Sequence, residues 1–336
     1  MSLPVYVRRR RTPRPQDFIA KQLKIPIGEA MRFLQSLKAW EKDFDGYYIN
    51  PTKRHVRPFW MVPKQAEQQA LTLAAAGAPG DQAKLVQFEV DTTGHYEIES
   101  TMFVATSSDF LVEIFDGGNN QKGLQNQPIH ARTIAGTARR KFIWPESYFL
   151  NVQNAPRTLN MNFRNLSGAP NTIRWLFHGR RWYHNEAPPN VAKAIWDRFA
   201  EMEKTYTYFL TLQPNTPETG VWANAPGVTL SAGQALTENQ APQFQATDEA
   251  DTEIHKLTYS ATGPFEFQIR ERQSGRTLSN GFVQVTNGWG DGEFPFVLPE
   301  TLLIERNYQL LFEIRDLSGA ENVIYPTLTG RRLQYA

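Results

Sequence analysis

The sequence predicts a mainly β protein with two tandem β-sandwich domains behind a basic arm and a small helical region. One observation is a long segment that occurs twice, and a second is a hydrophobic period of two from residue 85 onward. A third is the uneven charge. Residues 1–64 hold 14 Lys/Arg and 5 Asp/Glu, and the rest of the chain holds 22 and 29. A basic N-terminal piece therefore precedes an acidic, strand-rich body.

Residues 1–15 form the predicted arm, because three prolines oppose helix and a run of arginines repels itself. Apolar residues at helical spacing then predict a helix from about Gly28 to Trp40. Residues 41–63 read as irregular and aromatic, and residues 64–83 begin as an Ala-rich, helix-like stretch. The Gly-Ala-Pro-Gly sequence at 77–80 marks a break. We therefore expect residues 1–83 to be an anchoring region.

The arm has three open interpretations. Its arginines could neutralise nucleic-acid phosphates without reading sequence. Alternatively, the arm could become ordered against a neighbouring protein subunit, or it could be a solvated tail. We favour the protein partner, and the residues predicted to bind it are Arg8, Arg9, Arg10, Arg11 and Arg14.

Short strand candidates separated by turn residues fill the rest of the chain, which favours sandwiches or barrels. We expect the first β-sandwich at residues 84–187 and a connecting helix at residues 188–204, after the start signal Pro188-Pro189-Asn190. The second sandwich is expected at residues 205–336, enlarged by an insertion near residues 213–252.

The repeated segment is RNLSGAPNTIRWLFHGRR at 164–181 and RDLSGAENVIYPTLTGRR at 315–332, with ten of eighteen positions identical at an offset of 151. Earlier matches, such as Trp144-Pro145-Glu146 with Leu298-Pro299-Glu300, have slightly larger offsets. A steadily changing offset indicates a duplicated domain with loop deletions. Units this large are too few for a solenoid.

The repeated residues have a structural interpretation. Ser-Gly supplies a positive-φ turn between the last two strands of each domain, which we expect to form a hairpin. The later glycine is expected to end the returning strand. The paired arginines could bind a ligand or partner, but we favour contacts within their own domain. The structural residues predicted here are Ser167, Gly168, Gly179, Arg180, Arg181, Ser318, Gly319, Gly330, Arg331 and Arg332.

No motif indicates catalysis, a cofactor or a metal. The six histidines have no metal-ligand spacing, and no nucleophile elbow, Walker loop or dinucleotide fingerprint is present. The glycines at 287–292 favour a hairpin loop over a phosphate loop. An acidic cluster at residues 248–253 lacks the pattern of a calcium loop. We therefore expect no enzyme activity and no cofactor.

The chain has no cysteine, which excludes disulfides and thiolate metal sites. No apolar run is long enough to span a membrane, so we expect no membrane partner. The first residues have charges without a following apolar stretch, and we therefore expect no secretory signal.

A basic Pro-containing arm, a small helical region and tandem β-units with the NLSGA…GRR block together resemble a virion structural protein of a tailed bacteriophage. The resemblance covers residues 97–181 and 253–332. It implies jelly-roll-like sandwiches, a homo-oligomer, localisation in the virion after assembly in the host cytoplasm, and no catalytic residue.

The leading functional hypothesis is a structural virion component, such as a capsid-associated, decoration, collar or head–tail protein. Its partners would be other virion proteins and copies of itself, with non-specific contact of the arm with packaged nucleic acid. The alternative is a carbohydrate- or receptor-binding adhesin or fibre module, with exposed aromatic residues such as Trp222, Trp289 and Trp182 as its signature. A sandwich-fold hydrolase is the third hypothesis.

Overall fold

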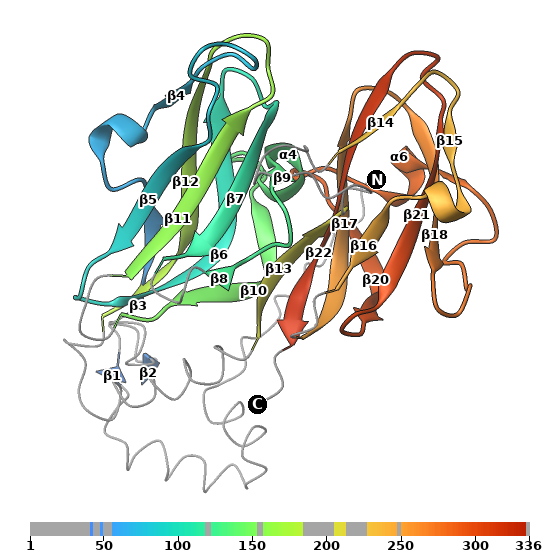
Figure 1. Ribbon diagram of the computed structural model, residues 1–336. Coiled ribbons are helices and arrows are strands. Elements are labelled where there is room, and N and C mark those ends of the chain that lie inside the picture. Colours follow the sequence, from blue (N-terminus) through green and yellow to red (C-terminus); the bar gives the residue numbers. More distant parts are fainter. Residues whose placement is uncertain are drawn as a thin grey trace, which may run out of the picture.

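The computed structural model describes residues 41–42, 48–49, 56–117, 122–152, 157–183, 205–212, 227–246 and 250–333. These residues form two antiparallel β-sandwiches that lie side by side (Figure 1). The mainly β fold with tandem sandwiches, predicted from the sequence, is confirmed. The arm, the helix at 28–40 and the connecting helix at 188–204 fall outside the described ranges.

The first sandwich has two five-stranded sheets. One has the strand order β10-β6-β12-β3, with β4 also paired to β12; its strands are β3 (Val56–Met61), β4 (Leu71–Leu73), β6 (His95–Ala105), β10 (Phe142–Leu150) and β12 (Asn171–Trp182). The other has the order β5-β11-β7-β8, with β9 also on β7; its strands are β5 (Lys84–Val90), β7 (Phe110–Asp116), β8 (Lys122–Gly123), β9 (Ile129–His130) and β11 (Arg157–Asn165).

The second sandwich repeats this plan. One five-stranded sheet has the order β13-β22-β17-β20, with β14 on β22; its strands are β13 (Thr205–Thr211), β14 (Val228–Leu230), β17 (Asp251–Ala261), β20 (Phe296–Ile304) and β22 (Asn322–Leu333). The other has the order β15-β21-β18-β19, with β16 on β21; its strands are β15 (Ala235–Leu236), β16 (Gln243–Gln245), β18 (Phe265–Glu271), β19 (Val283–Gln284) and β21 (Gln309–Asp316).

Short elements complete the described chain. These are the β1–β2 pair (Glu41–Lys42 and Tyr48–Ile49), the 3-10 turns η1 (Ala66–Gln68) and η2 (Glu238–Gln240), and the one-turn helices α4 (Ala131–Ile134) and α6 (Val285–Gly288). Helices α4 and α6 occupy the same place in the two sandwiches, each following a two-residue strand and preceding the loop to β10 or β20.

Alternating side chains build the core. Along β12, Ile173, Trp175 and Phe177 point inward and are buried, while Arg174, Leu176 and His178 face outward. The buried apolar residues of both sandwiches form one continuous cluster. At about 25 cal/mol per Å² of apolar surface removed from water, this cluster is the main source of stability.

The first sandwich begins earlier than the predicted boundary at residue 84. Strand β3 pairs with β12 from Phe177↔Met61 to Trp182↔Val56, and β4 pairs with the start of β12. The segment at 41–63, read as irregular, therefore contains an edge strand, and the helix-like stretch at 64–83 contains η1 and β4. Pro58 is tolerated because edge strands do not need every backbone N–H for the ladder.

The segment at 213–252 was predicted to be an insertion, but most of its described residues have counterparts in the first sandwich. Its described residues contain β14, which pairs with β22 as β4 pairs with β12. They also contain β15 and β16, which both pair with β21 as β5 pairs with β11. The segment is therefore the counterpart of the opening strands of the first sandwich, β4 and β5, part of which had been expected to belong to the N-terminal anchoring region.

The last two strands of each repeat do not form the predicted hairpin. Strand β11 lies in one sheet and β12 in the other, and β21 and β22 are divided in the same way. The Ser-Gly turn therefore crosses between the two sheets of a sandwich. Gly319 has the expected positive φ of 70°, whereas Gly168 is not among the described residues with positive φ.

Gly179 and Gly330 lie within β12 and β22 and do not end them. Each lies at a β-bulge: the register with β6 shifts between His178 and Gly179, and that between β17 and β22 shifts at the corresponding place. A Cβ atom on Gly179 would meet the Glu97 carbonyl oxygen at 1.8 Å. The bulge therefore needs glycine because two backbones approach closely.

Candidate assembly interface

Strand β13 joins the two sandwiches along both of its edges. One edge pairs with β22 of the second sandwich from Thr205 to Thr211. The other edge contacts residues 124–126 of the first sandwich, where the Phe209 N–H donates to the Leu124 carbonyl at 2.9 Å. Asn126 makes two bonds to the Thr211 backbone, at 2.8 and 2.9 Å. β13 therefore belongs structurally to both domains.

The Phe209 side chain extends the core of the first sandwich. Its ring lies 5.6 Å from that of Trp144 and 6.3 Å from that of Phe142, centroid to centroid, and it is fully buried. Edge-to-face and tilted contacts at this distance contribute beyond the area that they bury. One side chain of the second domain thus completes the core of the first.

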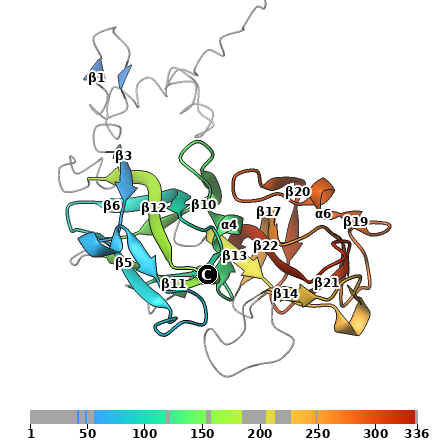
Figure 2. The same cartoon turned by 90° about the horizontal axis from the view of Figure 1, so that it is seen from above.

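Threonine hydroxyls form the polar part of the junction. Thr133 of α4 bonds to Thr327 of β22 at 2.9 Å, and Thr258 of β17 donates to the Thr133 carbonyl at 2.8 Å. The Glu146 N–H donates to the Thr207 hydroxyl at 3.0 Å. Figure 2, seen from above, shows α4 and β10 of the first sandwich against β17 and β22 of the second. Because these groups are buried and bonded, the junction holds one relative orientation.

Two loops continue the junction at the surface. The Gly292 N–H donates to the Arg132 carbonyl at 2.7 Å, and the Arg140 guanidinium lies 3.7 Å from the Phe294 ring centroid.

Lys256 of β17 also reaches the first sandwich. It donates to the Ile143 carbonyl and lies 4.9 Å from the Phe142 ring centroid. Burial lowers the pKa of Lys256 to about 8.

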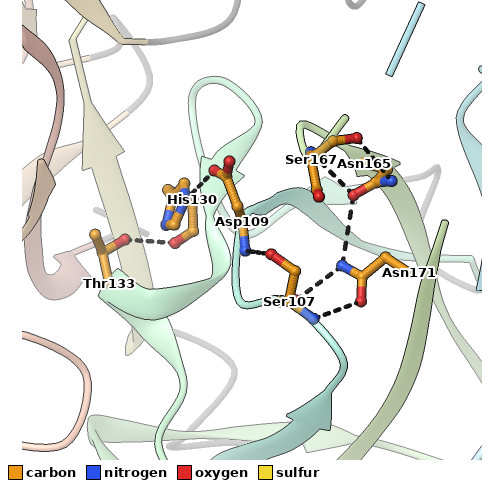
Figure 3. A network of polar contacts seen from close by, with 7 residues as sticks. All are labelled: Ser107, Asp109, His130, Thr133, Asn165, Ser167 and Asn171. Carbon is orange, nitrogen blue, oxygen red and sulfur yellow. Dashed lines mark hydrogen bonds and ion pairs between the residues drawn. The ribbon is translucent and has the colours of Figure 1, made fainter. Parts of the chain in front are cut away.

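A polar network links the repeated turn to this junction (Figure 3). Asn171, fully buried, accepts from the Ser107 N–H at 3.0 Å and donates to its carbonyl at 2.8 Å. The Asp109 N–H donates to the Ser107 hydroxyl, and the Asp109 carboxylate lies 3.2 Å from His130 Nε2. The His130 ring stacks on Tyr325 of the second sandwich, with centroids 4.8 Å apart. The network could not be predicted from the sequence, because its members lie far apart along the chain.

The buried position of His130 disfavours its charged form. Burial lowers the pKa of His130, and the Asp109 carboxylate offsets this effect only in part, while Arg132 adds to it. Burial also raises the pKa of Tyr325 to about 12. The second sandwich has Pro264 and Gln284 at the positions of Asp109 and His130, so the pair is particular to the junction.

We expect His130 to destabilise the protein in acid. Its folded pKa is below the ordinary value of about 6.5, so the unfolded chain binds protons first and stability falls as the pH drops below that value. His130→Gln, which introduces the residue of the second repeat, should reduce the loss of unfolding free energy between about pH 7 and about pH 5. Urea unfolding at both pH values measures this.

His178→Gln is the matched control, since His178 lies on the outer face of β12 and is only partly buried. It should change the acid-dependent loss much less. An equal effect from both variants would contradict the assignment to His130.

Each repeated arginine contacts residues of its own sandwich, and Arg331 also lies 3.9 Å from Glu146 of the first sandwich. Arg180 Nη2 lies 3.2 Å from Glu97 Oε1, and Arg331 Nε lies 2.6 Å from Glu253 Oε2. Arg181 donates to Thr93 at 2.7 Å and also contacts Asp91, while the Arg332 guanidinium lies over the Tyr208 ring. Apart from the Arg331–Glu146 contact, these contacts lie within the domain, as in the favoured alternative.

The repeated turns are held by their own side chains. The Ser167 N–H donates to Asn165 Oδ1 at 3.1 Å, and the Ser318 N–H donates to Asp316 Oδ1 at 3.0 Å. Burial opposes ionisation of Asp316, but bonds from Ser318 and the Gly233 N–H outweigh it and hold the pKa of Asp316 well below its usual range. The turn residues are therefore structural.

Exposed apolar side chains lie along two edge strands. β20 exposes Phe296, Val297 and Leu303, and β3 exposes Trp60. The Trp60 ring lies 5.4 Å from the His178 ring, whose Nδ1 is 3.4 Å from Lys141 Nζ.

The tryptophans suggested as exposed glycan contacts do not have that role in the structure. Trp289 and Trp182 are buried, and Trp182 donates to Glu97 at 3.0 Å. Trp222 falls in a range that the structure does not describe.

No cluster of three or more His, Asp or Glu side chains placed to hold a metal is found in the described part of the chain. Of the acidic cluster, Asp251 accepts from the Arg306 N–H at 2.9 Å and Glu253 pairs with Arg331. Among the described helices, none has the length and apolar character needed to cross a membrane. The predicted arm arginines, Arg8 to Arg11 and Arg14, are not in the described ranges.

No family model and no curated protein sequence matches the chain. Among solved structures, the plant receptor-like kinase ANX1 is similar at 8% identity with a TM-score of 0.23, covering 88% of this chain and 94% of that one. The N-terminal tandem CBM22 domain of Xyn10C from Paenibacillus barcinonensis has 10% identity, a TM-score of 0.17, and coverage of 89% and 94%. A turret protein of Sulfolobus turreted icosahedral virus has 10% identity, a TM-score of 0.13, and coverage of 73% and 98%. At these scores, the similarities carry no argument about function.

Proposed function

We propose that the protein is a non-catalytic structural component of a virus particle that acts by protein–protein assembly. The observation that carries this proposal is the exposure of large apolar side chains on β20 and β3, both at sheet edges. Exposed apolar edges are avoided in isolated soluble proteins because they promote association. Such edges are expected where another subunit covers them.

The rigid junction also supports an assembly role. β13 is buried on both faces, and its Phe209 belongs to the core of the neighbouring sandwich. Two domains held in one orientation present their outer surfaces at a fixed spacing, which suits a protein that must place partners in a regular array. The sequence block that resembles phage virion proteins forms strands and turns of both sandwiches, consistent with a structural part.

A glycan-binding module is the second candidate, and Trp60 is the observation that favours it. Its exposed ring lies beside His178 and near Lys141, which gives a stacking surface for a sugar with polar groups around it. Val62, two residues further along the chain, is also exposed, and an additional apolar side chain fits a protein partner better than a sugar.

Quantitative mass spectrometry of purified particles from the virus that encodes this chain tests the proposal. We expect the chain in the particles at a defined ratio to the major shell protein. A ratio near one indicates shell or decoration, and a much lower ratio indicates a collar or connector. Absence from particles, together with glycan-array binding that Trp60→Ala abolishes, would favour the module instead.

A further inference from the structure

The face of the first sandwich that receives β13 has a counterpart in the second sandwich. In the first, it consists of residues 124–126 and β10, with the sequences LQN and FIWPESYFL. In the second, the matching residues are 278–280 and β20, with LSN and FVLPETLLI. We call residues 278–280 and β20 the acceptor face. The two faces match in apolar character at nearly every position.

The acceptor face is open, whereas its counterpart is covered. Leu124 is fully buried and Leu278 is 49% exposed; Phe142 is fully buried and Phe296 is 38% exposed; Phe149 is 7% exposed and Leu303 is 52% exposed. β13 lies on the first face, where the Phe209 N–H donates to the Leu124 carbonyl and the Phe209 ring lies 6.3 Å from that of Phe142, and no described element lies on the second face. The second sandwich thus displays an apolar surface of the kind that the first buries.

Strand β13, which docks on the first sandwich, also has a counterpart. The counterpart is β3, whose Trp60 side chain is exposed. β13 precedes the second sandwich and places Phe209 opposite Thr329 of β22. β3 opens the first sandwich and places Trp60 opposite His178, the residue that aligns with Thr329 in the repeated block. Phe209 is fully buried, whereas Trp60 is 57% exposed. Trp60 therefore corresponds to the buried residue Phe209, but within the described chain it does not dock on another sandwich.

The polar groups of the junction are repeated as well. Asn126 makes two hydrogen bonds to the Thr211 backbone. The corresponding residue on the acceptor face is Asn280, which is exposed. Glu146 lies 3.9 Å from Arg331, and the corresponding pair is Glu300 with Arg180. Glu300 is exposed. A copy that docks β3 on the acceptor face would therefore meet the same apolar, amide and ionic chemistry.

We propose that copies of this chain associate head to tail, with β3 of one copy on the acceptor face of the next, in the way that β13 docks within each chain. Because the two surfaces differ, the contact is heterologous. Such contacts close into a ring or continue as a filament. The inference deepens the proposed assembly function by naming the partner and the residues, and it rests on that function only for its biological setting.

Light scattering after size exclusion of the full chain at several concentrations tests the inference. We expect oligomers whose mass rises with concentration up to a closed ring or a filament. Trp60→Asp and Phe296→Asp should each raise the apparent dissociation constant at least about 30-fold, since a charge at a buried aromatic anchor removes a hot spot. Both residues are exposed in the single chain, so each variant should fold, which circular dichroism checks.

The control is Leu85→Asp, which changes a similarly exposed apolar residue on β5, in the other sheet. It should leave the oligomer unchanged. A mixture of the Trp60→Asp and Phe296→Asp proteins should form a one-to-one dimer and nothing larger, because each variant keeps the surface that the other has lost.

A strictly monomeric wild-type chain overturns the inference. Oligomers that resist both variants also overturn it, but they leave the assembly function standing, because the chain then associates through another surface. Absence of the chain from particles would instead remove the proposed function and leave a positive light-scattering result intact.

Discussion

Phe209→Ala is expected to lower the free energy of unfolding by about 3–5 kcal/mol, the range measured for aromatic truncations in protein cores. The ring is fully buried between the two sandwiches and packs on Trp144 and Phe142. Its loss leaves a cavity in the first core and loosens β13. Urea unfolding followed by tryptophan fluorescence measures the change. We also expect the single transition to broaden, because the domains then unfold less cooperatively.

Trp60→Ala is the matched control, since it truncates the aromatic residue at the equivalent position of the first sandwich. At concentrations low enough to keep the chain monomeric, it should cost less than about 1 kcal/mol, as exposed substitutions do. Equal losses from the two variants would mean that Phe209 does not connect the domains in the way described.

Gly179→Ala is expected to lower the free energy of unfolding by about 3 kcal/mol or more, and Gly330→Ala by a similar amount. The new Cβ atoms would lie 1.8 Å from the Glu97 carbonyl oxygen and 2.1 Å from that of Glu253. Both obstacles are backbone atoms of the paired strand, so relief requires the bulge to open. Thermal and urea unfolding of the two variants measure the effect.

Gly168→Ala is the comparison, because a Cβ atom there has no neighbour within 4 Å and the φ angle is not positive. Its effect should stay within about 1 kcal/mol. If Gly168→Ala were as harmful as Gly179→Ala, crowding at the bulge could not be the reason for the glycine.

The duplicated architecture was predictable because its signal is local. Ser-Gly turns, alternating apolar residues and the terminal Gly-Arg-Arg all lie within one short block that recurs. The opening strands were missed for the opposite reason. β3 reads VRPFWM, with a proline and adjacent aromatic residues, and its strand character depends on pairing with β12, far away in sequence.

The roles of the repeated glycines and of the junction required three-dimensional contacts. Gly179 and Gly330 follow strand residues and precede arginines, a pattern that fits a strand end as well as a bulge. Trp60 and Phe209 occupy equivalent positions, yet β3 and β13 share almost no sequence. The correspondence between Trp60 and Phe209 is visible only in the register of β3 with β12 and of β13 with β22. Phe209 is buried because the neighbouring domain covers it, and Trp60 is exposed.

Cross-linking between single-cysteine variants most directly tests the central claim that the internal junction is repeated between copies. The chain has no cysteine, so Pro58→Cys and Glu300→Cys each introduce one thiol and leave Trp60 and Phe296 in place. By strand register these positions correspond to Thr207 and Glu146, which are hydrogen-bonded at 3.0 Å within the chain. With a short bismaleimide, a mixture of the two proteins should give a covalent one-to-one dimer, and neither variant alone should do so. Dimers from Pro58→Cys alone, or none from the mixture, would contradict the head-to-tail arrangement.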